Sequence, residues 1–197
     1  MTYSEPARTA ARRIRSSIIG VLEVVSSALI GVRLDQLRAS SAALRALGAE
    51  DGVVPDGVTV FDDDVPAVAN LDPALRGALR QAAADAAEAG VKFFVNSGWR
   101  SPRYQEQLRH EAVLKYGSQK KAARWVAAAD RSAHVSGHAI DVGPPEAAAW
   151  LSEHGARYGL CQIYRNEPWH YELRPEAVEH GCPPMYRDPT HDPRMKR

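Results

Sequence analysis

The chain has 197 residues, of which 45% are hydrophobic and 25% are charged, a composition that excludes a disordered polymer and is typical of a globular protein. The 25 basic and 24 acidic residues give a formal net charge of +1, so the overall charge provides no case for nucleic-acid binding. The length suits one domain of ordinary size with extensions.

Residues 1–39 join a basic start to an apolar segment at residues 16–32. This order is typical of a signal peptide or a signal anchor. The segment is at the short end of what spans a bilayer, and Glu23 costs about 2–3 kcal/mol on insertion scales. The alternative is an amphipathic helix that covers the domain or pairs with another chain. We expect membrane targeting through residues 16–32.

Residues 40–57 contain several glycines and a proline, which predicts a linker, so the domain is expected to begin at Val58. Asp72 and Pro73 predict a helix start, because aspartate caps the first turn and proline fits there. Apolar residues at helical spacing follow as far as Gly90.

A β-branched and aromatic strand is expected next, at residues 91–95, with a polar loop at its carboxyl end. Further along the chain, helices are expected at residues 102–116, 118–129 and 146–154, and strands at residues 139–142, 160–164 and 169–173. Late, adjacent strands indicate an α+β fold with a central antiparallel sheet and flanking helices. The domain is expected to end at residue 188, and the proline-rich basic end at residues 189–197 predicts a disordered tail.

Three residues of this domain form a normal set of zinc ligands. His134 and Asp141 flank a glycine, and His170 follows further along the chain. Imidazole, carboxylate and imidazole leave the fourth zinc position open, as a catalytic site requires. Zinc lowers the pKa of a bound water from about 16 to about 7. The sequence therefore predicts one zinc ion per chain.

A carboxylate close to this set has the position of a general base. Glu167 lies three residues before His170, and Pro168 restricts it to extended backbone geometry. Such a carboxylate can accept the proton of the attacking water and pass it to a leaving amine.

His138 is the competing ligand candidate, because it lies four residues after His134 and mimics the helical zinc motif H-E-x-x-H. The residue after His134 is Val135 rather than glutamate, and Ser136 and Gly137 disfavour a helix. We interpret His134 as the ligand and His138 as its neighbour.

Three ordered motifs carry a family resemblance. The first is S-G-W-R-S at residues 97–101, the second is S-x-H-x-x-G-x-A-x-D at residues 132–141, and the third is E-x-W-H at residues 167–170. Together they resemble the zinc D-alanyl-D-alanine peptidases, most closely the VanY-type carboxypeptidases. The resemblance covers residues 58–188, and it implies the fold shared with lysostaphin-type peptidases and the hedgehog amino-terminal domain.

The resemblance implies hydrolysis of the terminal D-Ala-D-Ala bond of peptidoglycan stem peptides. Glu167 is then the catalytic base, with zinc-bound water as the nucleophile, and Arg100 is the cation that faces the substrate carboxylate or the developing oxyanion. Ser132 either binds the substrate or supports its loop, and Gln105 is a further substrate-binding candidate. A D,D-dipeptidase, an endopeptidase and a non-catalytic zinc-stabilised wall-binding module are the alternatives.

This function places the protein outside the cytoplasm, secreted or anchored at the bacterial cell wall, and we expect a monomer. In that compartment Cys161 and Cys182 are expected to form a disulfide, and separate buried thiols are the alternative.

Overall fold

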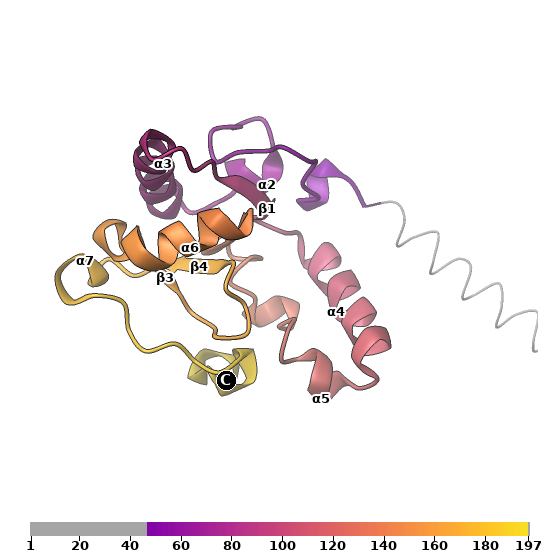
Figure 1. The fold of residues 1–197 in the computed structure, drawn as a ribbon. Coiled ribbons are helices and arrows are strands. Elements are labelled where there is room, and N and C mark those ends of the chain that lie inside the picture. The colour runs from indigo at the N-terminus through magenta and orange to yellow at the C-terminus, as the bar shows by residue number, and fades with distance from the viewer. Residues whose placement is uncertain (1–46, 197) are drawn as a thin grey trace, which may run out of the picture. The chain divides into compact units, whose positions relative to one another are not determined.

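A computed structural model describes residues 47–196 of the chain (Figure 1). The predicted N-terminal region at residues 1–39, with its apolar segment at residues 16–32, lies outside the described residues. The first part of the predicted linker at residues 40–57 also lies outside them. Between residues 47 and 196, the structure contains no helix that is both long enough and apolar enough to cross a membrane.

The centre of the domain is a four-stranded antiparallel sheet, which confirms the predicted α+β class. The strands are β1 (Phe94–Ser97), β2 (Ala139–Gly143), β3 (Leu160–Gln162) and β4 (His170–Leu173). Their order in the sheet is β1-β2-β4-β3, and every neighbouring pair is antiparallel. β2 and β4 therefore lie side by side in the middle, although the chain between them includes a helix and β3.

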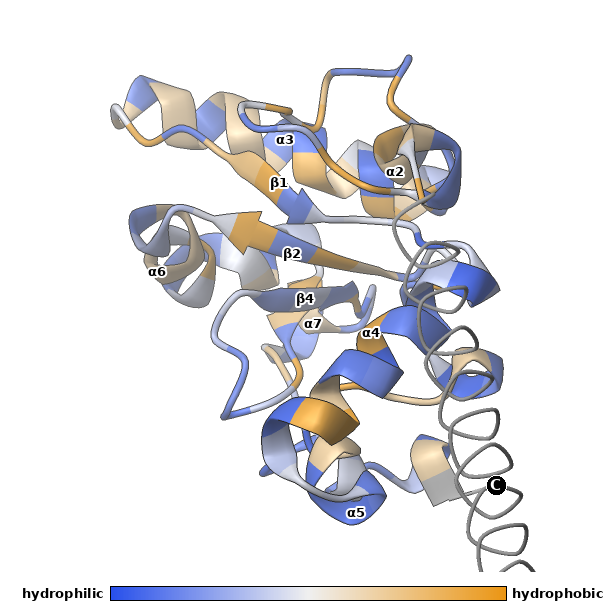
Figure 2. Cartoon of the chain, turned by 90° about the vertical axis from the view of Figure 1, so that its right-hand side faces the viewer, coloured by the Kyte–Doolittle hydropathy of each residue, from blue (hydrophilic) through white to orange (hydrophobic). Residues whose placement is uncertain are grey.

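The two faces of this sheet have different roles. Ile140 and Val142 of β2 and Tyr171 of β4 belong to the main hydrophobic core. Successive side chains of a strand point to opposite faces, so Asp141 and His170 lie on the other face. Two helices cover the core face, α3 (Pro73–Glu88) and α6 (Pro145–His154), whereas α4, α5 and the C-terminal end lie toward the other side (Figure 2).

Local capping explains where α3 ends and where β1 begins. The side chain of Asp72 accepts hydrogen bonds from Ala74 N and Leu75 N, as the sequence predicts for a helix cap. At the other end, Val91 N donates to Ala86 O across Gly90, which has φ +77°. This bond uses the amide of Val91 to close the helix, so Val91 is not part of the predicted strand, and β1 starts at Phe94.

The helix predicted over residues 102–116 is confirmed as α4 (Pro102–Tyr116), but the helix predicted over residues 118–129 is too long. α5 covers only Gln119–Ala122. Arg124 then binds Asp188 through its Nε at 2.9 Å, and the carbonyl of Ala127 accepts a hydrogen bond from Gln105 Nε2 at 2.8 Å. These long-range contacts hold residues 124–127 outside a helix.

The remaining elements are short. They are the α-helices α2 (Pro66–Ala69) and α7 (Ala177–His180) and the 3₁₀ helices η1 (Ala49–Asp51), η2 (Ala129–Arg131), η3 (Gly155–Tyr158), η4 (Pro189–His191) and η5 (Pro193–Lys196).

The predicted linker at residues 40–57 is wrong for its second half, because the compact unit begins at Leu47. Asp51 is buried. Its Oδ1 accepts a hydrogen bond of 2.6 Å from Ser101 Oγ, and its carbonyl accepts one of 2.8 Å from Ser101 N. The segment before Val58 thus supports the start of α4.

The predicted disordered tail at residues 189–197 is wrong for residues 189–196, which form η4 and η5. The carboxylates of Asp188 and Asp192 are fully buried here. Arg124 binds Asp188, and Arg194 binds Asp192. Paired buried charges anchor this segment, and a sequence profile of prolines and arginines does not reveal them.

Cys161 and Cys182 form a disulfide between residues 21 positions apart. Replacing both cysteines by alanine should lower the free energy of unfolding by about 3 kcal/mol, because the bond restricts the unfolded chain. Urea denaturation of the variant and the parent protein would measure this difference. A difference below about 1 kcal/mol would show that the cross-link contributes little to stability.

Candidate metal and catalytic site

The strand register brings the site residues together. Ser97 of β1 lies opposite Asp141 of β2, and Asp141 lies opposite His170 of β4. His134 reaches the same place from the turn before β2. Gly137 in that turn has φ +75°, and a Cβ there would lie 2.5 Å from Asn70 O, so a glycine is required.

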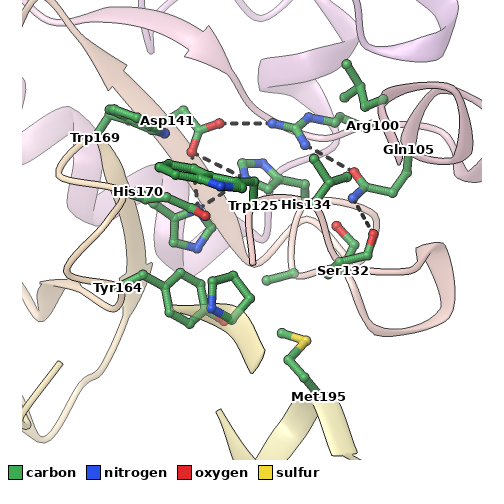
Figure 3. Close-up of a pocket in the computed structure, with 16 residues that line it drawn as sticks. Arg100, Gln105, Trp125, Ser132, His134, Asp141, Tyr164, Trp169, His170 and Met195 are labelled. Carbon is green, nitrogen blue, oxygen red and sulfur yellow. Dashed lines mark hydrogen bonds and ion pairs between the residues drawn. The ribbon is translucent and has the colours of Figure 1, made fainter. Parts of the chain in front are cut away.

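Three donor atoms form a nearly equilateral triangle (Figure 3). His134 Nε2 lies 3.2 Å from His170 Nδ1 and 3.3 Å from Asp141 Oδ1, and His170 Nδ1 lies 3.1 Å from that oxygen. Ligands placed at about 2.0–2.1 Å around a tetrahedral zinc ion lie about 3.3 Å apart. The three side chains are buried, and their spacing fits one face of such a tetrahedron.

The second ring nitrogen of each histidine has a partner that fixes its tautomer. His134 Nδ1 lies 2.8 Å from the carbonyl oxygen of Gly98, which can only accept. His170 Nε2 lies 3.4 Å from Glu172 Oε1. With protons on those outer nitrogens, both inner nitrogens present lone pairs beside the carboxylate of Asp141, as metal ligands do.

Electrostatics of the protein without a cation agree with this arrangement. Burial would lower the pKa of His170, but its hydrogen bonds to Asp141 and Glu172 raise the pKa to about 9. Burial opposes ionisation of Asp141, but His134 and His170 hold its pKa well below the ordinary value. In the metal-free protein the raised pKa of His170 favours a protonated imidazole, and binding of a metal to Nδ1 would release one proton.

Glu167 lies in the connection between β3 and β4, with Oε2 at 3.9 Å from His170 Nδ1. Its Oε1 is buried and has no hydrogen-bond partner among the described residues. The pKa of Glu167 is raised to about 7, mainly by burial; the positive charge of His170 opposes this rise and the negative charge of Asp141 adds to it. The carboxylate therefore has a free oxygen and a high proton affinity beside the ligand triangle.

Arg100 binds the carboxylate oxygen of Asp141 that the histidines leave free (Figure 3). Its Nη2 donates to Asp141 Oδ2 at 2.9 Å, and its Nε donates to Ser97 Oγ at 2.6 Å. Its Nη1 donates to Gln105 Oε1 at 3.1 Å. Arg100 thus positions a candidate ligand and also places a positive charge in the wall of the cleft.

A cleft with a cavity of about 260 Å³ lies over these groups. Its wall includes Arg100, Ser132 and Glu167, and two half-exposed indoles, Trp125 and Trp169, also border it. The sequence motifs that were far apart along the chain therefore meet in one open cavity.

Comparisons with known proteins identify the family of the chain. A family model described as VanY, D-alanyl-D-alanine carboxypeptidase, matches residues 69–176, which is more than half of the chain. The chain belongs to the VanY family. Membership makes it a peptidoglycan peptidase of the carboxypeptidase class.

Several solved structures are similar to this VanY-family chain. A mutant of the vancomycin-resistance D,D-pentapeptidase VanY from a VanB-type cassette, in complex with Zn(II), is 27% identical with a TM-score of 0.50. The match covers 52% of this chain and 72% of that chain. VanYB in complex with D-alanine-D-alanine is 26% identical with a TM-score of 0.52, and the match covers 56% and 74% of the two chains.

The LD-carboxypeptidase LdcB shares the fold, with a TM-score of 0.51, 22% identity, and coverage of 67% of this chain and 72% of that chain. Among curated proteins, the comparison found no match.

The other candidates from the sequence have different surroundings. Gln105 is buried and lines the cleft, but its oxygen accepts from Arg100 and its Nε2 donates to Ala127 O, so it orients Arg100. Ser132 is buried in the cleft wall, and its carbonyl accepts from Ser136 N. Contact of either residue with the substrate stays a prediction. His138 is exposed and binds Ser136 Oγ, outside the ligand triangle.

Sequence reasoning missed three contributors to this VanY-family site. Glu172 binds His170, Tyr164 packs its ring 5.2 Å from the His170 ring, and Met195 lines the cleft. The alternation of His170, Tyr171 and Glu172 along a strand could have placed Glu172 on the ligand face. No sequence signal links Met195 to the cleft.

Proposed function

We propose that the protein is a zinc-dependent D,D-carboxypeptidase that removes the terminal D-alanine from peptidoglycan stem peptides ending in D-Ala-D-Ala. The observation that carries the proposal is the triangle of His134 Nε2, Asp141 Oδ1 and His170 Nδ1. Beside it lies an oxygen of Glu167 that has no hydrogen-bond partner within residues 47–196. One zinc ion per chain fits this donor set.

When bound, zinc supplies a Lewis acid that polarises the peptide carbonyl and makes water acidic at neutral pH. Glu167 accepts a proton from the attacking water and later gives it to the amine of the departing D-alanine. Arg100 presents positive charge to the terminal carboxylate or to the oxyanion. These groups line one cavity, so a peptide bound there would contact all of them.

The substrate class follows from the family and from one neighbour. VanYB, 26% identical over much of the domain, was solved with D-alanine-D-alanine. A substrate of this kind lies in the cell wall, so we propose an extracytoplasmic location for the enzyme, secreted or anchored through residues 16–32, and action as a monomer. The disulfide between Cys161 and Cys182 is compatible with an oxidising compartment.

Arg100→Lys should lower kcat/KM for a stem pentapeptide by about 10²–10³-fold, because lysine keeps the charge but lacks the planar fork that binds both Asp141 and Gln105. Steady-state kinetics would measure the loss. Arg109→Lys on the surface of α4 is a matched control and should stay close to the parent. Equal activity of Arg100→Lys and the parent would show that catalysis does not need the planar guanidinium of Arg100.

The pH dependence of kcat/KM should show an acidic limb caused by protonation of Glu167. Burial raises the pKa of this carboxyl to about 7, and the positive charge of a bound zinc ion acts in the opposite direction. The midpoint of the limb is therefore expected at or below pH 7, with kcat/KM falling as the pH decreases. An acidic limb centred well above pH 7 would point to a different base.

Release of free D-alanine from a stem pentapeptide ending in D-Ala-D-Ala tests the proposed function. Zinc-dependent release of single D-alanine, abolished by a chelator, is the expected result. Release of the intact dipeptide would instead indicate a dipeptidase, and cutting of only cross-linked wall would indicate an endopeptidase. Zinc binding without hydrolysis of any of these substrates would identify a wall-binding module.

A further inference from the structure

The C-terminal segment, defined here as residues 183–196, lies beyond the part of the chain that the family model matches, which ends at residue 176. It nevertheless reaches the candidate metal site. Pro189 and Met195 line the cleft, and the backbone of Tyr186 pairs with residues 163–165 next to β3. This segment therefore lies outside the matched part of the family domain and contributes to the cleft.

Glu172 connects the segment to the metal site. It is a charged residue only 1% exposed, in the same strand as His170 and on the same face. Its Oε1 lies 3.4 Å from His170 Nε2 and accepts a hydrogen bond of 3.1 Å from Arg194 Nη2. Its Oε2 accepts bonds from Arg194 Nη1 at 2.6 Å and from Arg174 Nη2 at 2.7 Å.

Arg194 is itself fixed by the C-terminal segment. Its Nε and Nη2 bind the buried carboxylate of Asp192 at 2.9 and 2.5 Å. Tyr164 donates its hydroxyl to the same carboxylate at 3.0 Å, and Arg131 Nη1 donates to Met195 O at 2.7 Å. The guanidinium therefore lies between two buried carboxylates. Its two terminal nitrogens donate to the two oxygens of Glu172 and form a bidentate pair.

We propose that Arg194 is a positioning residue for the metal site, which acts through Glu172 on His170. A carboxylate only accepts hydrogen bonds, so Glu172 requires the proton of the imidazole on Nε2 and leaves the lone pair on Nδ1, the atom that faces His134 and Asp141. Arg194 fixes both oxygens of Glu172 and thereby the orientation of the ring. The inference rests on the proposed zinc site and assigns part of its assembly to the C-terminal segment.

The test is the dissociation constant of zinc, measured by competition with a chelator on the full chain and well below the unfolding temperature. Arg194→Met should weaken zinc binding by about 10–100-fold, the effect typical of lost outer partners of metal ligands. Arg187→Met makes the same change in the same segment, at an exposed side chain that contacts Asp188 rather than Glu172, and should bind zinc as the parent does. Arg194→Lys keeps the charge without the fork, so an intermediate affinity is expected.

A purely structural role of Arg194 would lower the melting temperature and leave zinc affinity within twofold of the parent, and this result would overturn the inference. If Arg194→Met does not fold, Glu172→Gln decides, because it removes the carboxylate but keeps the side-chain size. Unchanged zinc affinity in Glu172→Gln would also overturn the inference. Failure of the parent protein to bind zinc would refute the proposed function itself, whereas an unaffected Arg194→Met in a zinc-binding parent would refute only the role of Arg194.

Discussion

Glu167→Gln should lower kcat by about 10²–10⁴-fold and leave the zinc content of the protein at one ion per chain, because the amide cannot accept the proton of water. The structure provides the reason for so selective an effect. The carboxylate lies 3.9 Å from His170 Nδ1, and its Oε1 has no protein partner, so the substitution breaks no hydrogen bond of that atom among the described residues. The fold should therefore tolerate the amide.

Kinetics with a stem pentapeptide and metal analysis of the purified variant would provide the two readouts. Glu153→Gln, an exposed carboxylate on α6, is the matched control and should retain parental kcat and zinc content. Retained turnover in Glu167→Gln would assign the base role to another group. Lost zinc in this variant would instead make Glu167 a ligand.

His134→Ala should weaken zinc binding by more than about 100-fold and remove activity with it. Loss of an outer partner of a metal ligand typically weakens metal affinity by about 10–100-fold, and loss of a direct ligand should weaken it more. The paired substitution His138→Ala removes the same side chain four residues later, where the imidazole is exposed and bonded to Ser136. It should bind zinc as the parent does.

Chelator competition on both variants would test the ligand assignment. Loss of zinc in His138→Ala with retention in His134→Ala would contradict the triangle seen here. Comparable losses in both would indicate that the turn before β2, rather than a single ligand, determines affinity.

The sequence alone predicts much of the central domain because short-range chemistry determines it. Asp72 and Pro73 start α3, and Ser101 starts α4, through hydrogen bonds made within a few residues. In the expected ligand set, Asp141 and His170 meet because β2 and β4 are neighbours in register, and His134 joins them from the turn before β2. Residue type and spacing identify the candidate ligands in the sequence, and strand pairing brings them together in the fold.

The errors share a different cause, which is pairing over long distances in sequence. Residues 118–129 have helical composition, but the helix ends at Ala122. Beyond it, Arg124 donates to Asp188 and Ala127 O accepts from Gln105. The last residues resemble a disordered tail until Arg194 is seen to bind Glu172. A local pattern of charge and proline contains no information about a partner more than 20 residues away.

The contacts of the C-terminal segment have a consequence for how a minimal catalytic fragment should be cut. A fragment ending at residue 176, where the family match stops, would contain every candidate ligand and Glu167. In such a fragment Cys161 would lack its disulfide partner, and the hydroxyl of Tyr164 would lose its hydrogen bond to Asp192. The buried carboxylate of Glu172 would bind one guanidinium instead of two. A fragment that keeps these contacts therefore has to extend beyond Arg194, and residues 47–196 contain all of them.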